Sequence, residues 1–309
     1  MSAPSSSQGG GAAAAAAPPA SPLAPTAPTK ECKKRLRRDI SALYKEPLPG
    51  VCVCVDDADF TLIHALVTGP FGTPYEGGFF LFELRCPYDY PHRPPKAQLL
   101  TTGGGRVRFN PNLYACGKVC LSILGTWAGP GWTPVHSISS VLLSIQSLMN
   151  EKPYHNEPGF ETAANPRDVD DYNDVIRHET LRAAVLDMAG DTSMNRSCPT
   201  PLRELMRELL LSFGEHYDAV CERERHRDGT AFCDPFNFNK GHFRYAEMQA
   251  KVAALLEQRG EELDVEGGEG EGGEGEGGDD EDGEGEGGEE EEGEGSTVGA
   301  AGAAPAADG

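Results

Sequence analysis

The most reactive side chains in this sequence are those of its nine cysteines, which are spaced irregularly from Cys32 to Cys233. A thiolate is both a nucleophile and a metal ligand, so both roles have to be weighed. Zinc is disfavoured, because Cys52 and Cys54 lie in a strand-like run and no second Cys or His pair has finger spacing. We therefore expect no metal site. The odd number and irregular spacing indicate reduced thiols, which are typical of the cytosol and the nucleus.

Cys120 lies in the segment whose composition is most suggestive of function. Residues 102–136 are rich in Gly, Pro and Asn and lack periodicity, and a long irregular segment of this kind is usually functional or flexible. Cys120 follows Asn112 by eight residues and has no His or Asp beside it in the sequence. A hydrolytic nucleophile here would need a base from elsewhere in the fold. Taken alone, the residues leave two interpretations open: a catalytic thiol, or one unpaired thiol among nine.

The formal charge of −22 on this 309-residue chain belongs to its C-terminal end. Residues 261–309 hold 20 of the 49 acidic side chains and none of the 27 basic ones, so the first 260 residues are nearly neutral. The first 260 residues therefore offer no bulk cationic field for nucleic acid or an anionic membrane. No stretch approaches the roughly 18 consecutive apolar residues of a membrane helix. We expect neither nucleic acid nor a membrane as a partner.

Both ends of the chain have compositions that cannot build a core. Residues 1–29 are almost wholly Ala, Pro, Ser, Gly and Thr, and they lack the basic and apolar regions of a signal peptide. They predict a disordered leader. Residues 261–309 are dominated by alternating acidic residues and Gly, which predicts a disordered acidic tail. Two roles for the tail stay open: an aid to solubility, or a segment that folds back on the basic first helix.

Between these ends the pattern predicts a helix, a four-stranded antiparallel meander, an irregular segment and further helices, which is an α+β arrangement. The first helix has an apolar stripe at helical spacing, and its basic residues lie largely off that stripe. Ser137 is a plausible N-cap for the next helix. The expected helices span residues 30–44, 137–149, 171–188, 201–226 and 243–259, and the expected strands span residues 51–55, 61–68, 78–85 and 96–101.

Five separated motifs resemble the ubiquitin-conjugating (E2) catalytic domain in order and spacing. They occupy residues 69–78, 87–95, 110–112, 120–124 and 132–134. This resemblance covers about residues 30–190 and implies the E2 (UBC-like) fold for that core. Residues 153–161 and 177–180 are similar, more narrowly, to the long Z-type E2 subfamily. That subfamily also has a helical C-terminal extension, which would occupy residues 191–260 here.

The resemblance implies an acyl transferase that accepts ubiquitin from an E1 enzyme as a thioester on Cys120 and passes it to a lysine amine, usually with an E3. ATP is used by the E1 step, and the E2 itself binds no cofactor. Exchange of one thioester for another needs an accessible thiolate rather than a strongly activated one. Transfer to lysine creates an oxyanion, for which Asn112 holds the position of the family's donor. The structural alternative is that Asn112 braces its own loop, and both roles can hold.

Four further residues are implied as supports of the site. Asn110 replaces the His with which the family's His-Pro-Asn motif begins, and that His is a loop support. Glu157 matches the acidic or polar position that orients the incoming lysine. His155 and Asn156 belong to an insertion of the subfamily. A plain surface turn is the alternative interpretation of the segment from His155 to Glu157.

The resemblance also assigns two partner surfaces. Without it, the basic face of the first helix would be taken for an ordinary solvated face. The family docks E1 on that helix and E3 on two loops, although His92 stands where the E3 loop usually offers an aromatic residue. The matching positions are Lys34, Arg35 and Arg38 for E1, and His92, Arg93, Thr133, Pro134 and Val135 for E3.

The Z-type similarity implies two more specific expectations, which are charging by the second, alternative ubiquitin-activating enzyme and use of a ubiquitin-like modifier with two tandem ubiquitin folds. The reduced cysteines, with no signal peptide in residues 1–29, predict a cytoplasmic and nuclear location. Two other classes of protein remain as alternatives. A non-catalytic E2 variant would lack the cysteine, so the presence of Cys120 with Asn112 argues against it. An interaction scaffold would depend mainly on the helical extension and the acidic tail.

Overall fold

The structure of the protein, a computed structural model, describes residues 27–162 and 165–268, with side chains described as far as residue 261. The predicted leader, residues 1–29, lies almost wholly outside this range. Most of the predicted acidic tail also lies outside it, although helix α8 (Tyr245–Gly268) continues past residue 260, where the tail was expected to begin. Once a helix has formed, each added residue gains a hydrogen bond at little extra cost, which accounts for the continuation.

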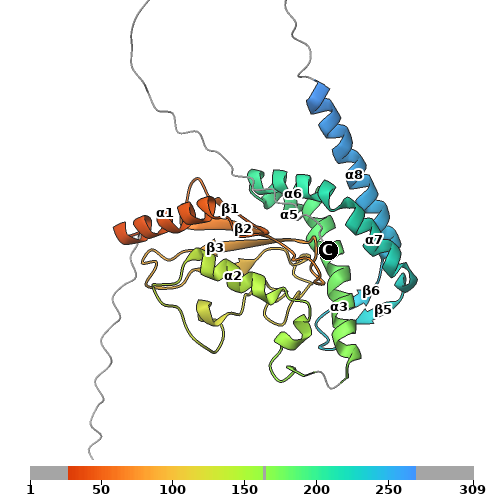
Figure 1. Ribbon diagram of the computed structural model, residues 1–309, viewed down its shortest axis with the longest axis horizontal. Coiled ribbons are helices and arrows are strands. Elements are labelled where there is room, and N and C mark those ends of the chain that lie inside the picture. Colours follow the sequence, from red (N-terminus) through yellow and green to blue (C-terminus); the bar gives the residue numbers. More distant parts are fainter. Residues whose placement is uncertain (1–26, 163–164, 269–309) are drawn as a thin grey trace, which may run out of the picture.

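The centre of the fold is the predicted antiparallel meander, in which the strands follow one another in the order β1-β2-β3-β4 (Figure 1). The register places Ala65 of the second strand opposite Val53 of the first and Phe82 of the third. The prediction of an α+β fold with four antiparallel strands is confirmed. The strands are β1 (Val51–Val55), β2 (Leu62–Thr68), β3 (Phe79–Arg85) and β4 (Lys96–Leu99).

Both faces of this sheet are covered by other parts of the chain. The sequence of β3 is therefore a nearly continuous run of apolar residues. Phe80 and Phe82 face a core that includes residues of helices α1 (Lys30–Lys45) and α2 (Ile138–Leu148). Phe79 and Leu81 alternate with them and face a second core. That core is built with residues of the C-terminal helices α6 (Thr200–Ser212), α7 (Gly214–Glu224) and α8.

The helix boundaries follow from local capping. The Thr29 side chain accepts a hydrogen bond from the N–H of Cys32 at the start of α1. Ser137 caps α2, as predicted, and forms a reciprocal capping box with Ser140. Tyr44, which the predicted apolar stripe included, is 51% exposed and therefore lies outside the core.

The C-terminal helices differ from the prediction in three places. Helix α3 (Arg167–Glu179) begins four residues early and continues as a π-helical segment, Thr180–Leu186, into α4 (Asp187–Ala189). The helix predicted over residues 201–226 is divided at Phe213 into α6 and α7. Gly214, the first residue of α7, lies so close to α8 that a Cβ atom there would be 3.0 Å from Leu256. Three short elements were not predicted, since three to five residues carry too little periodicity: α5 (Ser193–Ser197), β5 (Ala231–Cys233) and β6 (Lys240–His242).

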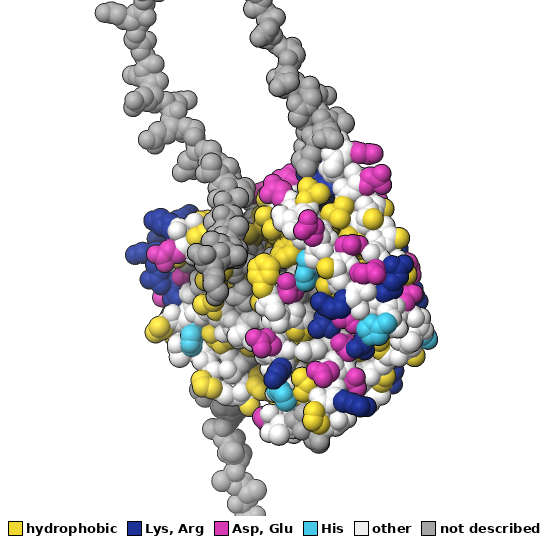
Figure 2. All heavy atoms as spheres, turned by 45° about the vertical axis from the view of Figure 1, so that its right-hand side comes forward, with side chains coloured by type: hydrophobic (Ala, Val, Ile, Leu, Met, Phe, Trp, Pro, Cys, Tyr) yellow, Lys and Arg dark blue, Asp and Glu magenta, His cyan; other side chains and the backbone are white. Residues whose placement is uncertain are grey.

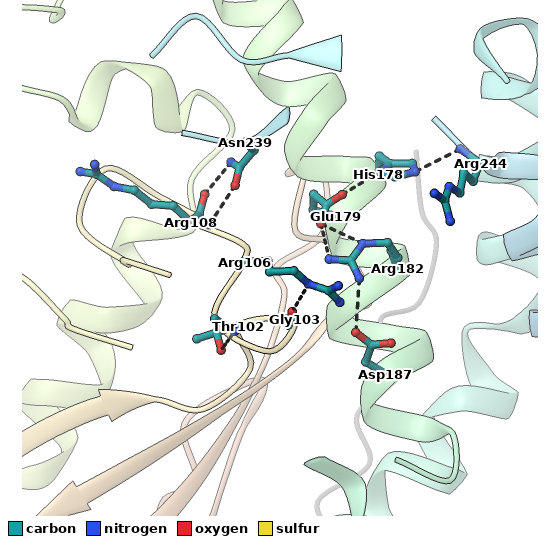
Figure 3. A network of polar contacts seen from close by, with 11 residues as sticks. Thr102, Gly103, Arg106, Arg108, His178, Glu179, Arg182, Asp187, Asn239 and Arg244 are labelled. Carbon is teal, nitrogen blue, oxygen red and sulfur yellow. Dashed lines mark hydrogen bonds and ion pairs between the residues drawn. The ribbon is translucent and has the colours of Figure 1, made fainter. Parts of the chain in front are cut away.

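A buried polar network joins the end of α3 to the start of α8 (Figure 3). The Glu179 side chain is 7% exposed and lies 3.0 Å from Nδ1 of His178, while Arg182 donates two hydrogen bonds to its other oxygen. The backbone N–H of Arg244 donates to Nε2 of His178, which assigns the ring proton to Nδ1. Burial alone would raise the pKa of Glu179, but the hydrogen bonds from His178 and Arg182 outweigh it and lower that pKa.

Replacing Glu179 with Ala should destabilise the protein by about 3 kcal/mol, because it leaves Arg182 and His178 without their acceptor. In Glu179→Gln the loss should depend on pH. It should be full above the ordinary glutamate pKa of 4.5 and should shrink as the pH falls through the lowered pKa of the folded state. Urea denaturation at several pH values measures both effects. The matched control is Glu247→Ala, which removes an exposed partner of Lys251 and should leave the urea midpoint unchanged. An unchanged midpoint for Glu179→Ala would contradict this account.

Candidate active site

The structure brings Asn112 and Cys120 together. The N–H of Cys120 donates to the carbonyl of Asn112 at 2.9 Å, and Nδ2 of Asn112 donates to the carbonyl of Cys120 at 2.9 Å. Between them the chain folds back through an isolated bridge of Leu113 with Val119. The two residues proposed for chemistry therefore face each other across a small reciprocal pair of hydrogen bonds.

Asn110 supports this turn from the buried side. Its Oδ1 accepts the N–H of Asn112 at 2.9 Å, and its Nδ2 donates to the carbonyl of Leu148 at the end of α2 and to the hydroxyl of Tyr75. The Tyr75 hydroxyl in turn donates to the carbonyl of Phe109 at 2.8 Å. Asn110 is fully buried, so it acts here as a brace, which is the role implied for the family's His.

Cys120 itself is 1% exposed in this conformation. A reaction of its thiol with another protein would therefore require a change of conformation that exposes it. Burial raises the pKa of several other cysteines, to about 11 for Cys198 and about 12 for Cys221, so those thiols stay protonated at neutral pH. Cys116, four residues before Cys120, is exposed. It is the neighbour from which any reactivity of Cys120 has to be distinguished.

The chain after Cys120 is held by Thr126, which the sequence did not single out. The Thr126 hydroxyl donates to the carbonyl of Val119 at 2.7 Å and accepts the N–H of Leu121 at 3.0 Å. Between these residues the backbone forms a single 3₁₀ turn that ends at Gly125 with a φ of +69°. A conformation with positive φ favours Gly, so Thr126 and Gly125 together fix how the chain leaves Cys120.

The turn that contains His155, Asn156 and Glu157 lies against the same site. Asn156 donates to the carbonyl of Leu148, the group that also accepts from Asn110. The His155 ring lies 2.8 Å from the carbonyl of Phe160, which fits the surface-turn interpretation of that residue. Asn156 therefore supports the Asn110 turn, while His155 fixes the shape of its own loop.

Glu157 has a partner that the sequence did not suggest. Its carboxylate lies 3.6 Å from the guanidinium of Arg108, and its side chain is 28% exposed. Arg108 also bonds the carbonyl of Pro111, next to Asn112. The Glu157 carboxylate and the Asn112 turn therefore share one arginine.

The loop between β5 and β6, residues 234–239, also lies beside the site, and the sequence did not predict this. Phe238 and Asn239 of this loop contact Arg108, although 131 residues separate Asn239 from it. Phe236 stacks on Tyr154 with ring centroids 4.8 Å apart. The run from Phe236 to Asn239, which alternates Phe and Asn between two predicted helices, was the available signal.

Comparison with known proteins decides the family. The family model described as "Ubiquitin-conjugating enzyme" matches residues 35–177. A Homo sapiens protein named ubiquitin-conjugating enzyme E2 Z is 52% identical over 244 residues, which cover 79% of this chain and 68% of that protein. The chain belongs to the ubiquitin-conjugating enzyme (E2) family.

Two further relatives agree with this E2 assignment. The Danio rerio protein named ubiquitin-conjugating enzyme E2 Z is 53% identical over 227 residues, or 74% of this chain and 68% of that protein. A Caenorhabditis elegans protein named probable ubiquitin-conjugating enzyme protein 17 is 46% identical over 165 residues, or 51% of this chain and 23% of that protein. The predicted similarity to the Z type is confirmed. Members of the family are transferases that work through a cysteine thioester.

Arg35, predicted as a residue for E1 binding, makes internal contacts that the sequence did not predict. Its side chain is 10% exposed, and its Nε donates to Asp39 at 2.8 Å. Its guanidinium also donates to the carbonyls of Pro134 and His136. Arg35 thus joins α1 to the loop at residues 133–136. Its predicted role in E1 binding stays a prediction.

The other two residues predicted for E1 docking are exposed. Lys34 lies on the outer face of α1, and the Arg38 side chain is 71% exposed. Figure 2 shows Lys and Arg side chains gathered at the end of the molecule where α1 lies. These two cations remain available to a partner.

The two loops predicted for E3 binding are joined to each other. Nε1 of Trp132 donates to the carbonyl of Pro91 at 2.6 Å. The exposed side chains around this junction suit a docking surface, since Val135 is 89% exposed. His92 lies 3.2 Å from Glu31 of α1, so the loop predicted for E3 binding and the helix predicted for E1 binding adjoin. The predicted residues on this surface, all of them exposed, are His92, Arg93, Thr133, Pro134 and Val135.

The part of the chain that the structure describes offers neither a metal site nor a membrane-spanning helix. In residues 27–162 and 165–268, no group of three or more His, Cys, Asp or Glu side chains lies close enough to hold a metal ion. Within the same part of the chain, no helix combines the length and apolar character that crossing a membrane would require.

Proposed function

We propose that this E2 accepts ubiquitin from an E1 as a thioester on Cys120 and transfers it to a lysine amine of a substrate, usually with an E3. The observation that carries the proposal is the reciprocal pair of hydrogen bonds between Asn112 and Cys120. It places a carboxamide donor beside Cys120, the cysteine that stands at the position of the family's catalytic thiol.

The proposed chemistry has two steps. First, the Cys120 thiolate attacks the E1–ubiquitin thioester and the E1 thiol leaves, so one thioester replaces another and no strong activation is needed. Second, a lysine amine attacks the new thioester carbonyl, and the oxyanion that forms needs a hydrogen-bond donor. Collapse of this intermediate breaks the C–S bond, releases the Cys120 thiolate and leaves ubiquitin on the lysine as an amide. The Asn112 carboxamide nitrogen carries two N–H groups. One bonds the Cys120 carbonyl, and we assign the other to the oxyanion, so Asn112 both braces the loop and stabilises the intermediate.

The acceptor lysine needs to lose its proton before it attacks, because the pKa of a free lysine is about 10.4. Glu157 is our candidate for orienting that lysine. It is partly exposed and lies beside Arg108, which holds the Asn112 turn. ATP is consumed at the E1 step, and no cofactor is assigned to this E2.

The partners of this E2 are proposed from the family and from the Z-type similarity. They are ubiquitin, an E1, E3 ligases and protein substrates, with the second, alternative activating enzyme as the E1. A ubiquitin-like modifier with two tandem ubiquitin folds is a further proposed cargo. We propose a cytoplasmic and nuclear location, in keeping with nine unpaired cysteines.

The direct test is incubation with E1, ATP and ubiquitin, followed by a non-reducing gel. An adduct that disappears on treatment with a thiol reductant supports the thioester. Absence of any adduct, with an E1 that charges itself, would support the alternative of a non-catalytic binding module or scaffold.

Charge reversal of the exposed cations on α1 should slow charging. The double variant Lys34→Glu, Arg38→Glu should lower the initial charging rate about tenfold at low salt, because it replaces attraction to the E1 with repulsion. The effect should shrink at high salt, where the Debye length falls. The control is Lys240→Glu, which reverses an exposed charge on β6. Equal charging rates for the double variant and the wild type across the salt series would refute this docking face.

A further inference from the structure

The loop between β5 and β6 is a rigid element of the C-terminal extension. Asp234 is 1% exposed, and its carboxylate accepts three backbone N–H groups of its own loop. Oδ1 accepts from Phe236 at 2.9 Å and from Phe238 at 3.1 Å, and Oδ2 accepts from Asn239 at 2.6 Å. The loop therefore presents Phe238 and Asn239 in a fixed orientation.

The side chain of Asn239 forms two hydrogen bonds with the backbone of Arg108. The N–H of Arg108 donates to Oδ1 of Asn239 at 2.9 Å, and Nδ2 of Asn239 donates to the carbonyl of Arg108 at 2.9 Å. Figure 3 shows the carboxamide facing this backbone segment, with both bonds side by side. Asn239 is 4% exposed, so neither bond competes with bulk water.

The side chain of Arg108 connects the β5–β6 loop to the active site. Its guanidinium lies between two rings, 3.9 Å from the centroid of Tyr114 and 3.6 Å from that of Phe238. From this sandwich it donates to the carbonyl of Pro111 at 2.5 Å and lies 3.6 Å from Glu157. Pro111 immediately precedes Asn112, so the extension is connected to the proposed donor through one arginine.

We propose that Asn239 and Arg108 are positioning residues, through which the C-terminal extension holds the Asn112 carboxamide in place for transfer to lysine. The proposal rests on the donor role assigned to Asn112 above. Transfer depends on the position of that donor, and a misplacement of about 1 Å can cost about 100-fold in rate. Charging of Cys120 is a thiol exchange that needs no such donor. The contacts of Asn239 and Arg108 should therefore matter for transfer to lysine and not for charging.

The first test is the near-isosteric variant Asn239→Asp in the full chain. It keeps the acceptor for the N–H of Arg108 but turns a carboxylate oxygen toward the carbonyl of that residue. We expect charging from E1 to stay within about twofold of wild type and single-turnover discharge onto free lysine to fall about tenfold. The matched control is Lys240→Ala, the next residue and an exposed one, which should change neither rate.

The second test separates positioning from general stability. If Asn239 acts through Asn112, the double variant Asn112→Ala, Asn239→Asp should discharge at the rate of Asn112→Ala alone. Multiplied losses in the double variant, or equal slowing of charging and discharge in Asn239→Asp, would indicate a merely structural role and overturn the proposal. Phe238→Leu, which removes one face of the arginine sandwich, provides the same comparison if Asn239→Asp fails to fold.

The outcomes also separate this inference from the proposed function. If the wild-type protein forms no thioester on Cys120, the proposed function itself is refuted. If the wild type charges and discharges normally and Asn239→Asp does the same, only the role of the extension is refuted.

Discussion

Replacement of Cys120 with Ala should abolish charging entirely, because the thioester then has no sulfur on which to form. Replacement with Ser should instead trap ubiquitin as an oxyester, which a thiol reductant does not cleave. The Ser variant is the more informative of the two, because it reports that the residue is reached by the E1 although Cys120 is 1% exposed in this structure. Both outcomes are read on gels run with and without reductant after incubation with E1, ATP and ubiquitin.

The matched control for Cys120 is Cys116→Ala. Cys116 lies four residues away and is exposed, so it is the thiol that nonspecific transfer would reach first. Its replacement should leave the yield and rate of charging unchanged. Normal loading of Cys120→Ala would refute the assignment. Loss of loading in Cys116→Ala would point to the exposed thiol as the acceptor.

The sheet and the first two helices could be predicted from the sequence, because each carries its own local signal. The first strand was predicted at its observed bounds, and Ser137 was predicted as the cap that it forms. The approach of α8 to Gly214, beside the break at Phe213, could not be predicted in the same way, because it is a contact between distant segments. Local periodicity reports on a single element and says little about where two elements touch.

In the candidate site too, some features have a signal in the sequence, whereas contacts between distant segments have none. The family resemblance, carried in part by the motifs at residues 110–112 and 120–124, predicted that Asn112 acts beside Cys120. Nothing near Arg108 indicates that Asn239 holds it, because the two are 131 residues apart and the strands beside Asn239 are only three residues long. The contacts of Arg35 were not predicted for a related reason. Its position on the helix suggested a surface cation, but its partners come from the loop at residues 133–136.

Replacement of Asn112 with Ala should separate the two steps of the reaction. Charging should proceed at nearly the wild-type rate, because thiol exchange does not rely on the carboxamide. Discharge onto free lysine should fall about 100-fold or more, the usual cost of losing one oxyanion donor. Single-turnover discharge of the purified thioester measures this directly, since the concentration of charged enzyme is then known at the start.

Asn112 also donates to the carbonyl of Cys120, so a loss of bracing has to be distinguished from a loss of the donor. Asn156→Ala is the matched control, because it removes another carboxamide from the same region, where Asn156 donates to the carbonyl of Leu148. If bracing alone matters, Asn112→Ala should lower charging and discharge together, along with the urea midpoint, and Asn156→Ala should have a similar if smaller effect. If Asn112 is the donor, only Asn112→Ala should slow discharge selectively. A wild-type discharge rate in Asn112→Ala would leave that residue with a structural role alone, and the oxyanion would then need a donor from another part of the site.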